Sequence, residues 1–272
     1  MQLQKYLDRI SFGGKPAPTL DTLNQLLAHH ARCVPFENLD VQLGLPLTTS
    51  PAEAFNKIVS NNRGGWCYEQ NGLFGWALAE IGYEVTRIAA AVMRAERGNT
   101  AIANHLCLLV RPVDDDRTFL ADVGFGGSMY KPIALEASEH VQVPFGMGLR
   151  RTDDGFWQFW EDIGKGEFSF DFEEREADED ALHAKCKFLQ EDPSSSFVQN
   201  LVAQIRLPDA HKSLRGKVLS HVTSNGIETY HVESADQLLS ILEEVFDLDV
   251  PEIADAWPRI EARHEELFGD KN

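Results

Sequence analysis

Hydrophobic positions along the first 82 residues recur at helical spacing. In residues 3–10 and again in residues 20–27, apolar side chains lie three or four positions apart, which is typical of helices that bury one face. Pro35 ends or bends the second segment because proline lacks a backbone N–H. The order Ser50-Pro51-Ala52-Glu53 predicts a helix start with a capping box. Another helix is predicted over residues 67–82, since Gly82 suits a helix C-terminus.

The hydrophobic period changes at about residue 85. Val, Phe, Leu and Trp then gather in short runs separated by turn residues, which predicts strands over residues 85–93, 104–111, 118–123, 141–149, 156–160 and 167–173. Asp114-Asp115-Asp116-Arg117 is expected to join the second and third strands as a hairpin. Short strands at this spacing indicate an antiparallel sheet or a barrel.

The last hundred residues combine both patterns. Helices are predicted over residues 178–190, 235–246 and 255–268, and strands over residues 201–207, 214–223 and 227–232. Asn225-Gly226 is a strong hairpin turn between the last two strands. The chain therefore reads as helices, then strands, then a mixed unit, which indicates an α+β fold.

Composition and charge narrow the class of partner. The 272 residues include 43 acidic and 25 basic side chains, for a net charge of −18. This excess argues against nucleic acid and against an anionic membrane surface as partners. Two stretches account for this excess: residues 161–192 have a net charge of −8, and residues 228–272 have a net charge of −10. We interpret both as solvated surface.

The sequence predicts a cytoplasmic protein with reduced thiols. It has no run of 18 apolar residues, and its N-terminus lacks the basic start and apolar core of a signal peptide. No CxxC pair and no Cys/His cluster with zinc-ligand spacing is present, so no metal is expected. The oligomeric state is not predicted. The four cysteines are Cys33, Cys67, Cys107 and Cys186.

The stretch from Asn62 to Gly72, which reads NRGGWCYEQNG, carries the strongest chemical signal. Two glycines make a tight turn, and Cys67 follows at the start of the predicted helix. The free N–H groups of a helix N-terminus stabilise a thiolate and can also hold an oxyanion. The alternative is a small buried hydrophobe under a helix start. The glycines and the polar residues that follow favour a nucleophile.

A thiolate nucleophile needs a base, and the base needs an orienting group. His105 opens one predicted strand and Asp122 ends the next, and a hairpin between the strands brings the two side chains near each other. An unpaired buried carboxylate would be costly. The alternative is a pair of strand-end residues that face water.

A glycine-rich loop follows Asp122. The order Val123-Gly124-Phe125-Gly126-Gly127 leaves the backbone open to a ligand, and such N–H groups can meet phosphates. It is neither a dinucleotide fingerprint nor a Walker A motif. A plain turn fits equally well.

These motifs together resemble the arylamine N-acetyltransferases. Residues 63–71, RGGWCYEQN, are similar to the signature of that family around its catalytic cysteine, and residues 34–39, VPFENL, to a second signature. His105 and Asp122 fall where the family has the rest of its triad. Residues 192–197, DPSSSF, resemble a third family segment.

The resemblance implies a three-part architecture with a papain- or transglutaminase-like Cys-His-Asp core. A helical bundle over residues 1–84 would carry the nucleophile. A β-barrel over residues 85–192 would carry His105 and Asp122, and an α/β lid would cover residues 193–272.

It also implies a ping-pong reaction with acetyl-CoA as co-substrate and no bound cofactor. Cys67 would take the acetyl group as a thioester, and an arylamine, arylhydrazine or N-hydroxyarylamine would accept it. His105 would act as base and acid, with Asp122 fixing its tautomer, and the backbone N–H of Tyr68 would hold the oxyanion. Xenobiotic detoxification is the usual role suggested for the family.

The resemblance also implies supporting roles for residues outside the triad. Three aromatic residues, Phe36, Phe125 and Phe197, would line the acceptor site, and Gly124, Gly126 and Gly127 would lie near the acetyl-CoA entrance. Glu37 and Arg63 would form a structural ion pair that holds the turn before Cys67.

Two features lie outside the family pattern. Many relatives have Thr where this chain has Asn104, a change expected to affect the acceptor or CoA contact. Residues 193–227 contain four bases and one acid, Asp209. These bases are weak candidates for phosphate contact, and a solvated face is the simpler interpretation. They are Arg206, Lys212, Arg215 and Lys217.

Three alternatives stay open at this point. An amide synthase of the same fold would join a polyketide acyl chain to an arylamine. A Cys-His-Asp hydrolase or transglutaminase-like enzyme would act on amides without CoA. A non-catalytic binding protein would not need all of Cys67, His105 and Asp122.

Overall fold

The N-terminal helices pack around one apolar core. In the computed structural model, which describes residues 1–126 and 129–268, Tyr6, Leu23 and Phe74 are fully buried in this core. The predicted helix start is confirmed, with Ser50 at the N-cap and Pro51 in the first turn. Ser50 makes no side-chain cap bond, however, and Glu53 accepts a hydrogen bond from the Thr48 hydroxyl at 2.8 Å. The helices are α1 (Leu3–Arg9), α2 (Leu20–Cys33), α3 (Leu39–Leu43), α4 (Pro51–Phe55), which runs on as a π-helical turn (Asn56–Ser60), and α5 (Cys67–Ile81).

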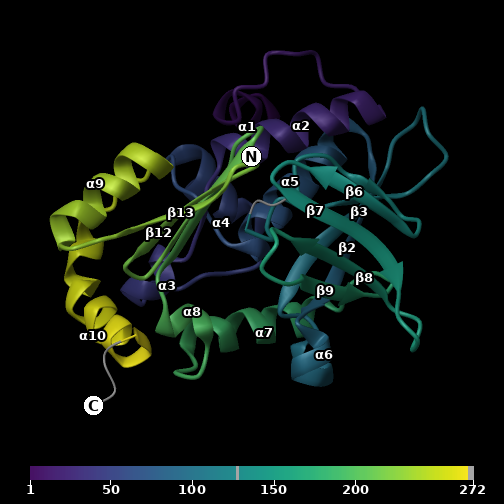
Figure 1. The fold of residues 1–272 in the computed structure, drawn as a ribbon. Coiled ribbons are helices and arrows are strands. Elements are labelled where there is room, and N and C mark those ends of the chain that lie inside the picture. Colours follow the sequence, from purple (N-terminus) through teal and green to yellow (C-terminus); the bar gives the residue numbers. More distant parts are fainter. Residues whose placement is uncertain (127–128, 269–272) are drawn as a thin grey trace.

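An eight-stranded antiparallel sheet follows and curls into a half-barrel (Figure 1). Its strand order is β5-β4-β3-β2-β9-β8-β7-β6. The predicted strand 141–149 is in fact parts of two strands, because Pro144 has no N–H to donate to a ladder. The strands are β2 (Glu84–Val92), β3 (His105–Arg111), β4 (Phe119–Ala121), β5 (Ile133–Ala134), β6 (Ser138–Gln142), β7 (Phe145–Arg151), β8 (Trp157–Asp162) and β9 (Phe168–Phe172).

A second antiparallel sheet lies in the C-terminal part but takes its first strand from the N-terminal part. The order is β1-β10-β11-β12-β13. The predicted strand 214–223 is wrong, since the chain turns at Gly216, where φ is +55°. The strands are β1 (Phe36–Glu37), β10 (Val202–Arg206), β11 (Ala210–Arg215), β12 (Val218–Thr223) and β13 (Gly226–His231).

The remaining helices cover the two sheets. The segment predicted as a helix over residues 255–268 begins as a 3₁₀ helix (Pro251–Ala256) and becomes α-helical at Trp257. No helix among the described residues is long and apolar enough to cross a membrane. The helices are α6 (Arg94–Arg97) with a 3₁₀ turn (Gly98–Ala101), α7 (Glu179–Glu191), α8 (Ser196–Gln199), α9 (Ala235–Phe246) and α10 (Trp257–Phe268).

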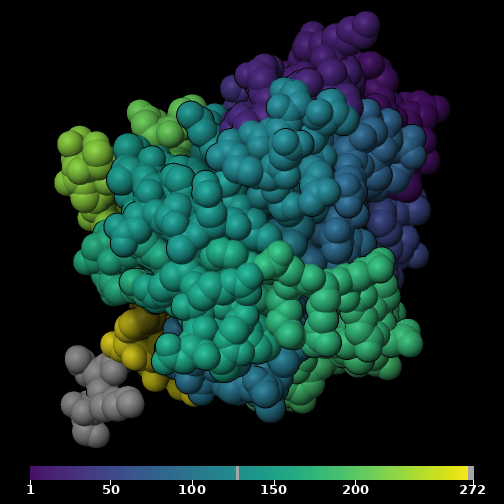
Figure 2. All heavy atoms as spheres, turned by 90° about the vertical axis from the view of Figure 1, so that its right-hand side faces the viewer, coloured from purple at the N-terminus to yellow at the C-terminus, as the bar shows by residue number. Residues whose placement is uncertain are grey.

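These parts meet around the start of α5. Figure 2 shows the face on which the middle of the chain, in teal, lies against the purple N-terminal segment. A small apolar cluster that includes Trp66, Cys67 and Leu106 joins α5 to β3 and to α7. The predicted α+β class is confirmed. The division at residues 84 and 192 stays a prediction.

Candidate active site

Cys67 is the first residue of α5 and is 3% exposed. The turn before it is fixed by strand-like contacts, since Gly65 N–H donates to Pro35 O at 3.2 Å and Glu37 N–H donates to Gly65 O at 3.1 Å. A Cβ at Gly64 would lie 2.2 Å from Pro35 O, so only glycine fits there. The Cys67 thiol therefore lies at a helix start, and hydrogen bonds from the preceding turn to Pro35 and Glu37 hold that turn in place.

A buried charge cluster supports this turn. Lys57 Nζ lies 2.9 Å from Asp40 and 3.0 Å from Glu69. Arg63 Nη2 contacts Glu37 at 2.9 Å and Asp40 at 2.8 Å. Burial raises the pKa of Glu69 to about 7, and Lys57 offsets only part of that effect. The Glu69 carboxylate also accepts the Trp66 N–H at 3.1 Å, so the cluster is bonded directly to the N-terminus of α5.

His105 and Asp122 form a buried hydrogen bond of 2.6 Å between Nε2 and Oδ2. They are 2% and 1% exposed. Burial lowers the pKa of His105, but the Asp122 carboxylate and the Cys67 thiol outweigh it and raise that pKa to about 10. Because Nε2 is engaged by Asp122, Nδ1 is the ring nitrogen left for the thiol. The three side chains can therefore act as nucleophile, base and orienting group.

Asn71 of α5 holds the carboxylate in place. Its Nδ2 donates to Asp122 Oδ1 at 2.8 Å and to Leu106 O at 2.6 Å, and its Oδ1 accepts the Val123 N–H at 3.0 Å. Gly124 N–H also donates to Asp122 Oδ1, at 2.7 Å. The helix that carries Cys67 is thus bonded to the strand end that carries Asp122.

The glycine loop after Asp122 passes very close to Cys67. A Cβ at Gly124 would lie 2.7 Å from Cys67 Cα, and one at Gly126, where φ is +77°, would lie 2.2 Å from Gln204 Oε1. Both positions therefore require glycine. Gly127, also predicted near the acetyl-CoA entrance, lies outside the described residues.

A cavity of about 540 Å³ opens onto Cys67 and His105. All three predicted aromatic residues, Phe36, Phe125 and Phe197, line it, and so do Gly124 and Gly126. The Phe125 ring lies 5.4 Å from the His105 ring and stacks on Phe168 at 4.9 Å. Such walls suit a flat aromatic ligand.

Two further residues have their side chains engaged elsewhere. The Tyr68 hydroxyl donates to Ala103 O at 2.6 Å, while its N–H, at the second position of α5, has no helical partner. Asn104 accepts the Val92 N–H at 2.7 Å and donates to Val92 O at 3.3 Å. Its amide therefore pairs with the end of β2, and the residue also lines the cavity that opens onto Cys67.

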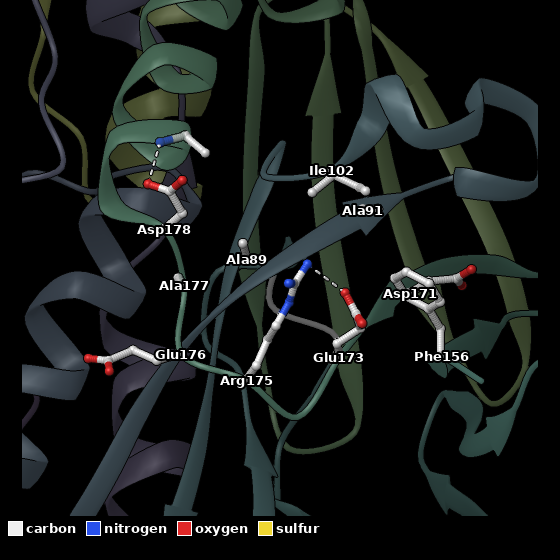
Figure 3. Close-up of a pocket in the computed structure, with 11 residues that line it drawn as sticks. Ala89, Ala91, Ile102, Phe156, Asp171, Glu173, Arg175, Glu176, Ala177 and Asp178 are labelled. Atoms are coloured by element: carbon white, nitrogen blue, oxygen red, sulfur yellow. Dashed lines mark hydrogen bonds and ion pairs between the residues drawn. The ribbon is translucent and has the colours of Figure 1, made fainter. Parts of the chain in front are cut away.

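A second cavity, of about 240 Å³, is lined in part by Ala89 and Ala91 of β2 (Figure 3). Two of its acidic side chains have structural partners: Asp171 binds Arg94 at 2.7 Å, and Asp178 caps α7. Within residues 1–126 and 129–268, no group of three His, Cys, Asp or Glu side chains could hold a metal ion.

Comparison with known proteins decides the family. Residues 19–255 match the family model described as N-acetyltransferase. The arylamine N-acetyltransferase of Mycolicibacterium smegmatis is 36% identical over 269 residues, which cover 93% of this chain and 94% of that protein. This chain belongs to the arylamine N-acetyltransferase family. It is therefore an acyltransferase enzyme, of a family whose co-substrate is acetyl-CoA.

Solved structures agree with this assignment. The M. smegmatis enzyme superposes with a TM-score of 0.87 at 34% identity, covering 96% of this chain and 97% of that one. The Mycobacterium marinum enzyme, solved in complex with CoA, has a TM-score of 0.86 at 31% identity, with 98% and 99% covered.

Sequence reasoning did not find several residues of this arylamine N-acetyltransferase site. Asn71 stands in the signature stretch, but nothing in the sequence shows that it reaches Asp122. Lys57 and Asp40 have no local signal, because their partners are distant in sequence. Phe168 stood in a predicted strand with no sign of which face it would take.

Proposed function

We propose that this enzyme transfers the acetyl group of acetyl-CoA to the nitrogen of arylamines and arylhydrazines, and to the oxygen of N-hydroxyarylamines, through a thioester on Cys67. The observation that carries the proposal is the buried Cys67–His105–Asp122 group at the wall of a Phe-lined cavity. Family membership supports the donor and the acceptor class.

In the first half-reaction, Cys67 Sγ attacks the thioester carbonyl of acetyl-CoA. The carbonyl oxygen takes up negative charge, which the N–H of Tyr68 would stabilise at the helix N-terminus. His105 holds the thiol proton and passes it to the sulfur of the leaving CoA. Asp122 keeps Nδ1 of the ring toward the thiol and stabilises the imidazolium.

In the second half-reaction, the amine nitrogen attacks the acetyl-Cys67 carbonyl. His105 takes the proton that the nitrogen loses and returns it to Cys67 Sγ as the C–S bond breaks, which leaves a neutral amide and a free thiol. The aryl ring would lie among Phe36, Phe125 and Phe197, whose apolar surfaces exclude water that would hydrolyse the thioester.

The test is intact-protein mass after mixing with acetyl-CoA alone. Wild type should gain one acetyl group and lose it when an arylamine is added, and Cys67→Ala should gain none. Cys33→Ala, which removes a half-buried thiol outside the site, is the control and should behave as wild type.

The same experiment separates the alternatives. A polyketide amide synthase would ignore acetyl-CoA but form an adduct with a larger acyl donor. A hydrolase would release free acetate without an acceptor, and a binding protein would form no adduct. A cytoplasmic location and a role with xenobiotics belong to the proposal and fit its four free thiols and its aromatic cavity.

A further inference from the structure

We infer that His211 is a positioning residue for the acceptor step. Its ring holds the Gly126 carbonyl, and through it the glycine loop, so that the Phe125 ring forms a fixed wall for the aryl group. His211 lies on β11 of the C-terminal sheet, in a part of the chain distant in sequence from the reacting groups. The inference rests on the proposed function, because it concerns how the aryl group of the acceptor is bound.

The glycine loop, residues 122–126, is held at both ends. At its first end, Asp122 accepts a hydrogen bond from Asn71 Nδ2 at 2.8 Å. At its other end, the carbonyl of Gly126 accepts the Nε2–H of His211 at 2.8 Å. The first anchor belongs to α5 and the second to the C-terminal sheet. A substitution can therefore remove the second anchor and leave the first in place.

Gly126 lies directly against one face of the C-terminal sheet. Its φ is +77°, and a Cβ there would lie 2.2 Å from Gln204 Oε1 of β10. Gln204 and His211 share this face, because Arg206 is two residues from Gln204 and pairs with His211 across the strands. The absence of a side chain at Gly126 thus allows the loop to approach closely enough for its carbonyl to reach His211.

His211 is itself held firmly. Arg206, one of the four bases expected on a solvated face, is instead fully buried. It donates to Ala210 O at 3.0 Å and to Gln142 O at 2.9 Å, which joins the start of β11 to the end of β6. The Phe145 ring packs edge-on against the His211 ring at 5.4 Å. The donor is therefore fixed before any ligand binds.

The protonation state of His211 suits a fixed donor. The residue is 7% exposed, and burial lowers its pKa to about 4, although the hydrogen bond to Gly126 opposes that effect. The ring is therefore neutral near pH 7 and carries one N–H, which the Gly126 carbonyl requires to be on Nε2. A ring with so low a pKa is a weak base at that pH, so His211 does not duplicate the role of His105.

Phe125 is the residue through which His211 acts. It precedes Gly126, it lines the cavity, and its ring lies 5.4 Å from the His105 ring. A shift of Gly126 would move this aromatic wall, while the hydrogen bonds within the triad would stay. Loss of the His211 bond should therefore weaken binding of the aryl group more than it slows the chemistry.

The test compares two nucleophiles in the single-turnover deacetylation of acetyl-Cys67. The arylamine p-anisidine carries an aryl ring, and hydrazine has none to place against Phe125. His211→Phe keeps a ring beside Phe145 but has no N–H to donate. It should raise the half-saturating concentration of p-anisidine about tenfold, the effect of one buried hydrogen bond, and change the maximal rate by less than about twofold. The rate constant for hydrazine should stay unchanged.

A second variant separates the hydrogen bond from packing. His211→Gln loses the ring but keeps an N–H at a similar reach, so it should bind p-anisidine better than His211→Phe does. A merely structural role predicts the reverse order, because Phe preserves the packing. His211→Asn, whose shorter amide does not reach the carbonyl, replaces His211→Phe if thermal melting shows that the latter is unfolded.

His221→Phe is the matched control. His221 lies on the neighbouring strand β12 and on the opposite face of the sheet, because its neighbour Val222 is the residue that pairs with His211. This variant should leave the reaction with both nucleophiles unchanged.

Three results would overturn the inference. An equal loss with p-anisidine and hydrazine would mean that His211 acts on the reacting groups. Unchanged binding of p-anisidine by a folded His211→Phe protein would mean that the loop needs no such bond. Better binding by His211→Phe than by His211→Gln would assign His211 to packing alone. Failure of the proposed function is distinguishable, because wild type would then form no acetyl-Cys67.

Discussion

At the residue scale, the site depends on a few polar contacts that cross between elements. Burial alone would lower the pKa of His105, but the Asp122 carboxylate and the Cys67 thiol outweigh this effect and raise it. That carboxylate is in turn held by Asn71 and by the Gly124 N–H. The reactive side chains are thus positioned by hydrogen bonds whose donors belong to α5 and to the glycine loop.

Asn71→Ala should slow thioester formation about 100-fold, because Asp122 loses a donor and the imidazole of His105 loses its fixed orientation. The measurement is single-turnover acetylation of Cys67 by acetyl-CoA. Asn24→Ala, which removes an amide hydrogen bond to Leu20 O in α2, is the control and should leave the rate unchanged. A normal rate in a folded Asn71→Ala protein would show that Asp122 needs no second support.

At the element scale, the N-terminus of α5 is held from two sides. The buried cluster around Lys57 supports the turn that precedes the helix, and the loop around Gly124 packs against its first residue. Each support joins segments that are distant in the sequence. A change in either should therefore move the nucleophile relative to His105.

Lys57→Met should lower the free energy of unfolding by about 3–5 kcal/mol, because Arg63 would still pair with Glu37 and Asp40 but the buried Glu69 carboxylate would lose its cation. Burial lowers the pKa of Lys57, but Glu37, Glu69 and Asp40 together raise it well above its usual value, so the amine is charged in the native state. Urea unfolding measures the change. Arg150→Met breaks a solvent-exposed pair with Glu167 and should cost less than about 1 kcal/mol; equal effects of the two variants would contradict the argument.

Gly124→Ala should reduce acetyl transfer about 100-fold and destabilise the fold by about 1–3 kcal/mol, since the new Cβ would overlap Cys67 and Asn71. Steady-state rates and thermal melting would show both effects. Gly13→Ala adds a methyl group where nothing lies within 4 Å and should alter neither. An active Gly124→Ala enzyme would mean that the loop can retreat without harm to the site.

At the scale of the whole molecule, buried histidines link stability to pH. His30 accepts from the Tyr6 hydroxyl at 2.8 Å and bonds Gln70 Oε1 at 3.2 Å. These partners suit the neutral ring, and burial lowers the pKa of His30 to about 3. Burial likewise lowers the pKa of His211 to about 4.

His30→Gln should be less stable than wild type at pH 7, and the difference should shrink by about 2 kcal/mol at pH 5. The unfolded chain protonates His30 below its ordinary pKa, while the folded chain does so only near pH 3. The stabilisation by His30 is therefore present above about pH 6.5 and is lost as the pH falls. Urea unfolding at both pH values measures it. His140→Gln, at an exposed position, should show no such change with pH. If the stability difference between wild type and His30→Gln is the same at pH 7 and pH 5, His30 does not link stability to pH.

The sequence by itself predicted most of the elements and the residues proposed to carry the chemistry. Periodicity located α2, α5 and most strands, because burial of one face requires apolar residues at fixed spacing. The turn and helix start around Cys67 could be predicted because both depend on the conformation of only a few neighbouring residues, including two glycines. The hairpin placed His105 and Asp122 near each other because hairpin register is also local.

Only the tertiary structure decided how these elements meet. Asn71 with Asp122, and Lys57 with Asp40 and Glu69, join segments whose spacing along the chain carries no signal of contact. The pairing of β1 with β10 likewise arises from packing of distant segments. Local pattern fixes which face of an element is buried, but which surfaces come together depends on the side-chain packing of the whole chain.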